Sequence, residues 1–220
     1  MAPAAERLTV VMAYWNTRES SARFQAFRNE LDQLEKLRTL AMAARHEAGG
    51  EKALLDQRAA LASARADLMD EEAVFVEEQF SLTLALRLPL DRDWILPITP
   101  PQAGGYASAA HGDSNSLRRR WLSRTIAAHY EELKELSAAV VYADDDRASA
   151  VRPRLQSGQN HVAVERAVWA VRTQTDLTLD FLRCARRYNA AIAEYAIDVL
   201  GPNVSRATLL KALVLPTDDA

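Results

Sequence analysis

The chain has 220 residues, a length that fits one large domain or two small ones. It carries 40 alanines but only 7 glycines and 8 prolines, a composition that favours helices over a turn-rich β-sandwich or barrel. The formal net charge is −3, so the sequence lacks the basic excess that is typical of nucleic-acid binding. Its single cysteine excludes a disulfide within the chain.

The sequence shows no membrane or export segment. No run of about 18 apolar residues predicts a transmembrane helix. Residues Met1 to Arg7 lack the basic and apolar regions of a signal peptide. A cytoplasmic protein and a fragment of a longer exported protein both fit these observations.

Glycine and proline positions divide the chain into long segments without helix breakers. A breaker inside a helix costs about 1 kcal/mol for glycine and about 3 kcal/mol for proline, so clustered breakers mark the ends of helices. Pro153 is the one breaker inside a segment, and it is expected to kink or end that helix early. Helices of this length indicate coiled-coil or long-bundle packing. The predicted helices, of roughly 35 to 45 residues each, lie in residues 6–48, 51–88, 117–157 and 159–200.

Apolar residues recur at every seventh position of the second segment, which predicts a left-handed supercoil. We expect the buried seam to contain Leu54, Leu61, Leu68, Phe75 and Leu82. A second stripe is expected beside it, with alanines on the same face, at Leu55, Ala62, Met69, Val76, Ala59, Ala66 and Ala73. The polar set that should face water is Asp56, Ser63, Asp70 and Glu77. In the fourth segment the expected stripes are Val164, Val171, Thr178, Ala185, Ile192 and Val199, with Phe181, Tyr188 and Tyr195 beside them.

Helices joined by a short glycine turn must lie antiparallel. The predicted fold is therefore all-α: two long antiparallel helical hairpins that form a coiled-coil-like four-helix bundle, plus a short C-terminal helix. We expect one domain, residues 1–220, with hairpin 1 at 6–88, a linker at 89–116, hairpin 2 at 117–200 and a short helix and tail at 201–220. Ser205 is the expected N-cap of the short helix. In the linker, the apolar residues expected to pack on the bundle are Trp94, Ile95, Leu96 and Ile98.

The two hairpins also look like copies of one another. When Gly49 is placed over Gly158, Leu55 falls on Val164 and Ala62 on Val171. Helix and turn lengths then agree, although identities are few. This pattern indicates a duplicated hairpin.

The repeated pattern resembles a known family. A long helix, a tip of the form Arg-x-x-x-Gly and a heptad helix occur twice, as in the periplasmic hairpins of TolC-like outer-membrane efflux proteins. In the second copy, the pair Tyr188-Asn189 before an apolar and small run ending at Tyr195 is similar to that family's closing helix. Gly201-Pro202 and the final short helix resemble divergent, planctomycete-type members. In the first copy, Ala13-Tyr14-Trp15 resembles the start of the family's first long helix, and Pro89-Leu90 resembles its exit.

The resemblance covers residues 10–214 and applies to the helical part of such a protein, because nothing before Val10 supplies the family's first pair of strands. It implies a location in the periplasm or outer membrane, a trimeric homo-oligomer that forms an export duct, and a periplasmic adaptor that docks at the hairpin tips. Each glycine also fits a simple turn that binds no partner. If an adaptor does dock, we expect Gly158→Trp and Gly49→Trp to disturb partner binding more than stability. The candidate partner-binding residues are Gly49, Gly50, Gln156, Ser157, Gly158 and Gln159, within tips that also contain Glu47, Ala48, Glu51 and Asn160.

No residue pattern predicts an enzyme or a cofactor. The histidines His46, His111, His129 and His161 share no metal-ligand spacing, so we expect no metal site. Cys184 has no helix-start or elbow motif that would activate it. Asp144-Asp145-Asp146 is best interpreted as a solvated helix face, since consecutive helical residues point about 100° apart. Arg118-Arg119-Arg120 fits either a contact with phosphate or an acidic partner, or a cover for the bundle end.

Two functional hypotheses remain. The first is a non-enzymatic, TolC-like component of an envelope export system, whose hairpins pack into a duct and dock an adaptor. The alternative is a stand-alone helical bundle that serves as a scaffold or oligomerisation module. An enzyme in the bundle core would need Glu-x-x-His pairs, which the sequence lacks.

Overall fold

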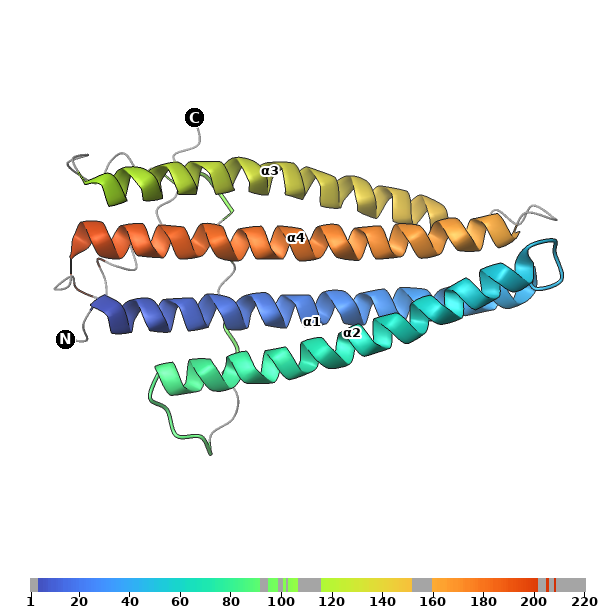
Figure 1. Ribbon diagram of the computed structural model, residues 1–220, viewed down its shortest axis with the longest axis horizontal. Coiled ribbons are helices and arrows are strands. Elements are labelled where there is room, and N and C mark those ends of the chain that lie inside the picture. Colours follow the sequence, from blue (N-terminus) through green and yellow to red (C-terminus); the bar gives the residue numbers. More distant parts are fainter. Residues whose placement is uncertain are drawn as a thin grey trace. The chain divides into compact units, whose positions relative to one another are not determined.

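The computed structural model describes residues 4–91, 95–98, 101, 103–106, 116–151, 160–201, 205 and 208. This described part contains helices and no strand, as predicted (Figure 1). The helices are α1 (Ala4–Ala44), α2 (Gly50–Ala85), α3 (Leu117–Val151) and α4 (Asn160–Leu200). Their lengths of 41, 36, 35 and 41 residues confirm the prediction from helix breakers. None of the helices, over the residues that the structure describes, is both long and apolar enough to cross a membrane.

The chain divides into two compact units, and each contains a part of every helix. Unit 1 comprises Met1–Ser20, Val76–Glu135 and Leu182–Ala220. Unit 2 comprises Ser21–Phe75 and Leu136–Phe181.

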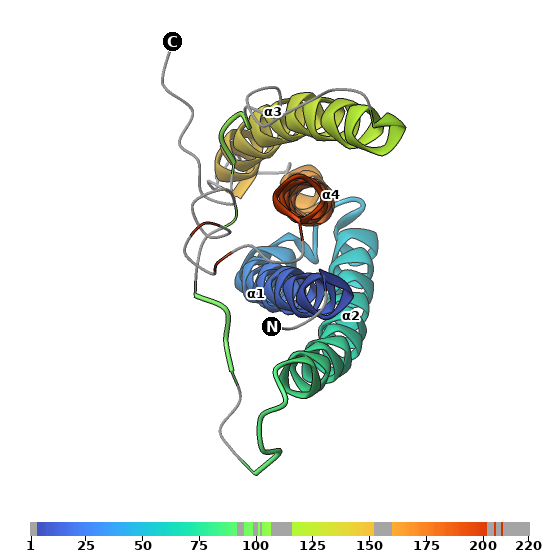
Figure 2. The ribbon, with the colours of Figure 1, turned by 90° about the vertical axis from the view of Figure 1, so that its left-hand side faces the viewer.

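Within unit 1 the helices form a row, in the order α2, α1, α4, α3 (Figure 2). The Thr17 hydroxyl of α1 donates a hydrogen bond to the Glu78 carbonyl oxygen of α2 at 2.9 Å. On its other side, α1 pairs with α4 through Glu19 and Arg186. α4 in turn contacts α3, where the Cys184 thiol lies 3.5 Å from the carbonyl oxygen of His129. The row leaves α2 and α3 at its two edges.

Within unit 2 all four helices contribute to one apolar core. Alanines are frequent in this core, and their small side chains permit close approach of the helices. Its buried residues are Leu34, Leu37, Ala60, Leu61, Ala64, Ala150, Ala167, Ala170 and Val171. A second cluster next to the α1–α2 turn contains Ala41, Ala53, Leu54 and Val164.

The expected seam of α2 is confirmed, but its expected neighbour is not. Leu54, Leu61 and Leu82 are buried, and Leu68 and Phe75 are half-buried. The second stripe was expected at Leu55, Ala62, Met69 and Val76, with Ala59, Ala66 and Ala73, yet all of these residues are exposed. A shift of one residue turns a side chain about 100° around a helix, so these residues point to solvent.

The inner face of α2 carries buried polar residues beside the seam, where a second apolar stripe was expected. The Gln57 amide donates a hydrogen bond to the carbonyl oxygen of Leu34 at 2.9 Å. Arg23 Nε donates to the carboxylate of the buried Glu71 at 2.9 Å. These hydrogen bonds offset part of the desolvation of the two buried side chains, while the other oxygens, Gln57 Oε1 and Glu71 Oε1, have no hydrogen-bond partner among the described residues.

Burial also corrects the alignment of the two hairpins. The expected match placed exposed Leu55 on buried Val164 and exposed Ala62 on buried Val171. Buried positions agree when the alignment moves by one residue, so that Leu54 matches Val164 and Leu61 matches Val171.

The linker and C-terminal predictions are met only in part. Leu96 and Ile98 are exposed, whereas Pro97 is buried, so those two residues do not pack on the bundle as expected. The backbone N–H of Thr208 donates to the Ser205 hydroxyl at 3.1 Å, which is the hydrogen bond of a helix N-cap. The predicted helix beyond Thr208, and Trp94 in the linker, lie outside the described residues.

Candidate functional site

The tip of the first hairpin is built by its two glycines. Gly49 has φ +85°, a left-handed conformation that glycine adopts without strain. Gly50 begins α2, and a Cβ there would lie 1.8 Å from the Ala44 carbonyl oxygen. Both glycines are therefore required by the turn, so a bulky residue at Gly49 should itself cost stability, contrary to the expectation for this tip. The same expectation for Gly158 lies outside the described residues.

Glu47 links this tip to the start of α4 through hydrogen bonds. Its carboxylate accepts hydrogen bonds from the Asn160 side chain at 2.6 Å and from the backbone N–H of His161 at 3.2 Å. Nδ1 of His161 also lies 3.3 Å from the carboxylate. Desolvation opposes ionisation of Glu47, but these hydrogen bonds outweigh it and lower the pKa of the carboxyl. A carboxylate at a helix N-terminus is favourable because backbone N–H groups point towards it.

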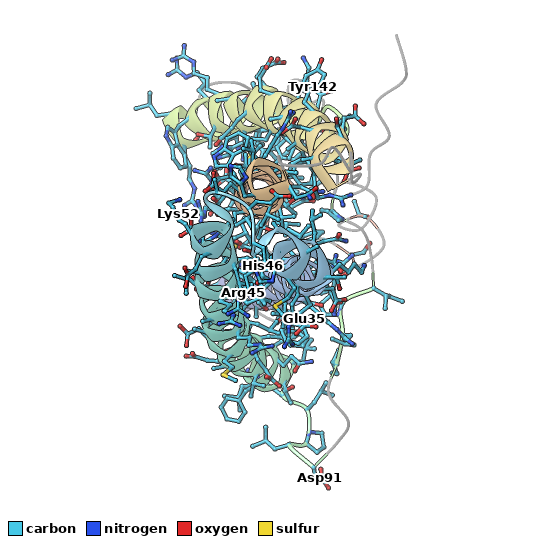
Figure 3. All side chains as sticks on the ribbon, turned by 90° about the vertical axis from the view of Figure 1, so that its right-hand side faces the viewer. Glu35, Arg45, His46, Lys52, Asp91 and Tyr142 are labelled. Atoms are coloured by element: carbon cyan, nitrogen blue, oxygen red, sulfur yellow. The ribbon has the colours of Figure 1, made fainter. Side chains whose placement is uncertain are left out.

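The tip still presents a polar surface to solvent. Arg45 and His46 are exposed in the turn, and Lys52 is exposed at the start of α2 (Figure 3). Lys52 pairs with Asp56 at 2.7 Å and with Glu165 of α4 at 3.0 Å. The predicted residues of the second tip, Gln156, Ser157, Gly158 and Gln159, lie outside the described residues.

A second apolar face runs along α2 on the side away from the seam. Leu55 is 57% exposed, Met69 68% and Val76 44%. From Leu55 to Phe80 the members follow alternating steps of four and three residues, the spacing of a coiled-coil seam. We call this face the outer α2 stripe; it contains Leu55, Ala59, Ala62, Ala66, Met69 and Ala73 in unit 2 and Val76, Phe80 and Leu84 in unit 1.

α3 also presents apolar side chains to solvent. In unit 1 these are Leu117 and Trp121, with exposed Ala128 two turns further on. In unit 2, Tyr142 lies on the outer side of α3 (Figure 3). Exposed Arg120 and Arg124 accompany the apolar residues of unit 1. Both edge helices of unit 1 therefore have apolar residues that the described part of the chain leaves exposed.

A polar cavity of about 360 Å³ lies between α1, α3 and α4 of unit 2. Glu30 lines it and is buried, with Arg172 Nε 3.8 Å from its carboxylate and the Thr175 hydroxyl hydrogen-bonded to it. Asp144, on the opposite wall, accepts a 2.7 Å hydrogen bond from Arg147. Because these charged groups are paired within the protein, they favour a polar layer of the core over a binding pocket.

The other charged runs also find partners inside the chain. Arg119 pairs with Asp198 of α4 at 2.9 Å, and Arg118 lies 3.8 Å from Glu194. This geometry supports the interpretation of the arginine run as a cover for the bundle end. In the acidic run, Asp146 pairs with Arg166 at 2.8 Å.

Cys184 is not placed as a nucleophile. The thiol is buried between α3 and α4. Burial, with the nearby Glu132 carboxylate, raises the pKa of Cys184 to about 11. Nucleophilic cysteines need the opposite shift, because the thiolate is the reactive form.

The fold and surfaces together define an all-α protein made of long helical hairpins. Comparison with protein families, curated proteins and solved structures finds no match for this chain.

Proposed function

We propose that the protein is a non-enzymatic helical component of an envelope export system, similar to the TolC-like efflux proteins, in which hairpins of several copies pack side by side into a duct. The observation that carries the proposal is the outer α2 stripe. A helix inside a wall of helices needs one seam for each neighbour. α2 has two such apolar faces. Its inner seam packs within the chain, and the outer α2 stripe has heptad spacing but faces solvent.

A second copy of this chain is the occupant that best fits the outer α2 stripe. In unit 1, α2 and α3 are the two edges of a row, and both edges carry exposed apolar residues. Exposed Glu77 borders the α2 edge, whereas Arg120 and Arg124 lie near the start of the α3 edge, so these two stretches are opposite in charge; exposed Glu131 and Glu135 follow further along α3. Contacts between unlike edges of successive copies close into a ring when the rotation allows it.

The resemblance extends this proposal to the tips and to the cell compartment. It implies a trimer, a location in the periplasm or outer membrane and an adaptor that docks at the tips. Exposed Arg45, His46 and Glu51 leave the first tip accessible for such a contact. The stand-alone scaffold remains the alternative, because the outer α2 stripe would also serve a simple oligomer.

Sedimentation velocity tests the lateral contact. Val76→Glu and Phe80→Glu place a charge in the outer α2 stripe, whereas Ser81→Glu adds the same charge to an exposed position beside it. Stability should change by less than about 0.5 kcal/mol in all three, because the sites are exposed. We expect wild type and Ser81→Glu to self-associate. The dissociation constants of Val76→Glu and Phe80→Glu should be at least about tenfold higher, which corresponds to about 1.4 kcal/mol of lost contact energy.

Particle shape separates the two hypotheses. Closed rings in negative-stain electron microscopy support a duct, whereas two-fold dimers support the scaffold. Wild type that stays monomeric at high concentration, or association that all three variants retain equally, contradicts the outer α2 stripe as an interface. For the tip, Arg45→Glu should weaken binding to a purified coiled-coil adaptor without changing self-association.

A further inference from the structure

The side chains of His129, Glu132 and Cys184 converge in unit 1. Their ligand atoms, one nitrogen, one oxygen and one sulfur, all lie within 4.8 Å of one another. Nδ1 of His129 is 3.2 Å from a carboxylate oxygen of Glu132. His129 and Glu132 are three residues apart on α3, so they share one helix face, and Cys184 reaches them from α4.

We propose that His129, Glu132 and Cys184 form a binding site for a divalent transition-metal cation, with Zn²⁺ as the best fit. An imidazole, a carboxylate and a thiol are the three side-chain types that bind zinc. Sulfur and nitrogen ligands disfavour Ca²⁺ and Mg²⁺, which take oxygen ligands. Three protein ligands leave a fourth position of the tetrahedron for water.

Arg187 is placed to orient the carboxylate. Its Nη2 donates to Oε1 of Glu132 at 2.8 Å, while Oε2 is the oxygen that faces His129. A ligating carboxylate is commonly held in this way by an outer hydrogen bond, which fixes the oxygen that the cation takes. Arg187 is thus a positioning residue and not a ligand.

The site is accessible from one side. The Glu132 side chain is 41% exposed, whereas Cys184 is buried. A cation could therefore enter past Glu132 and displace the thiol proton as it binds Cys184. Bound there, it would link α3 to α4 at a point where the apolar seam is interrupted by polar groups.

Titration of the metal-free protein with Co²⁺ and Zn²⁺ tests the site. Co²⁺ should give a sulfur-to-metal charge-transfer band in the near ultraviolet and visible bands of a tetrahedral centre. Zn²⁺ should bind once per chain in calorimetry and abolish the Co²⁺ spectrum. We expect Cys184→Ser and Glu132→Gln to weaken Zn²⁺ binding at least about tenfold.

His46→Ala is the matched control, since it removes an exposed histidine outside the cluster. It should leave both titrations unchanged. Glu132→Gln tests the site even if the Cys184→Ser variant, which changes a buried residue, fails to fold. The Glu132 side chain is partly exposed, and a glutamine amide can keep the Arg187 contact. Absence of the charge-transfer band, or Zn²⁺ affinity that is equal in wild type and in a folded Glu132→Gln variant, overturns the proposal.

Discussion

Glu30 is an acid within the packed interior of unit 2, with only 5% of the residue exposed. Burial disfavours its ionised form and raises its pKa, with further contributions from Asp67 and Asp176. The Thr175 hydrogen bond and the Arg172 guanidinium act in the opposite direction without cancelling the shift. At neutral pH this carboxylate therefore reduces the stability of the fold.

We expect Glu30→Gln to raise the melting temperature at pH 7, because an amide has no charge to desolvate and can still accept the Thr175 hydrogen bond. This difference in melting temperature should shrink as the pH falls through the raised pKa of Glu30 in the folded protein. Folded wild type then takes up a proton at Glu30 before the unfolded chain does, which removes the cost of the buried charge. Melting curves across this pH range provide the measurement. Glu35→Gln, at an exposed site, is the control and should change little. A lower melting temperature for Glu30→Gln at pH 7 would mean that the Arg172 pair outweighs desolvation.

The two tip glycines should differ in their tolerance of alanine. Gly49→Ala forces a left-handed residue, at a cost of about 1–2 kcal/mol. Gly50→Ala should cost more, because its Cβ would overlap the Ala44 carbonyl oxygen and the turn would have to rebuild. Urea unfolding of both variants checks the order, and equal losses would show that the turn adjusts freely.

Among the helices, α2 shows how far the sequence could predict the structure. Breakers placed the helix ends to within a few residues, since glycine and proline act locally. The seven-residue period predicted the buried seam at Leu54 and Leu61, but it did not predict which positions beside that seam are buried and which are exposed. α2 carries two apolar faces, and period alone cannot distinguish the face that packs within the chain from the one that is left outside.

This two-faced helix gives a direct prediction for Leu61 and Leu55, which have the same side chain and opposite exposure. Leu61→Ala should destabilise the chain by about 2–5 kcal/mol through lost burial and a cavity. Leu55→Ala should change stability by less than about 0.5 kcal/mol when the protein is dilute. Chemical denaturation of both variants provides the comparison. Similar losses for the two would mean that Leu55 is also packed in the folded chain.

The candidate sites were less predictable than the helices. Tip positions followed from glycine, but the contacts of Glu47 with Asn160 and His161 join residues far apart in sequence. The same holds for Cys184, which meets His129 only after α3 and α4 pack together. A search for ligand pairs within one helix would have found His129 and Glu132, three residues apart, but not the third ligand.

For the molecule as a whole, the sole cysteine gives a simple measure of opening. Cys184 is fully buried in unit 1. We expect an aromatic disulfide reagent to label it at least about 1,000-fold more slowly in the native protein than in denaturing urea, given ordinary folding stability. Absorbance of the released thiol follows the reaction. Native labelling as fast as that of the denatured chain would show that unit 1 opens constantly.

That burial also makes the chain suited to measuring cooperativity. Unit 1 already contains its reporter, and a Cys184→Ala chain with Ala64→Cys would move the only thiol into the buried core of unit 2. Each labelling rate then gives the opening free energy of one unit. Equal free energies would identify a single foldon that spans the lengths of all four helices. Unequal values would mean that the hairpins melt in segments, with the helices fraying from one unit while the other stays folded.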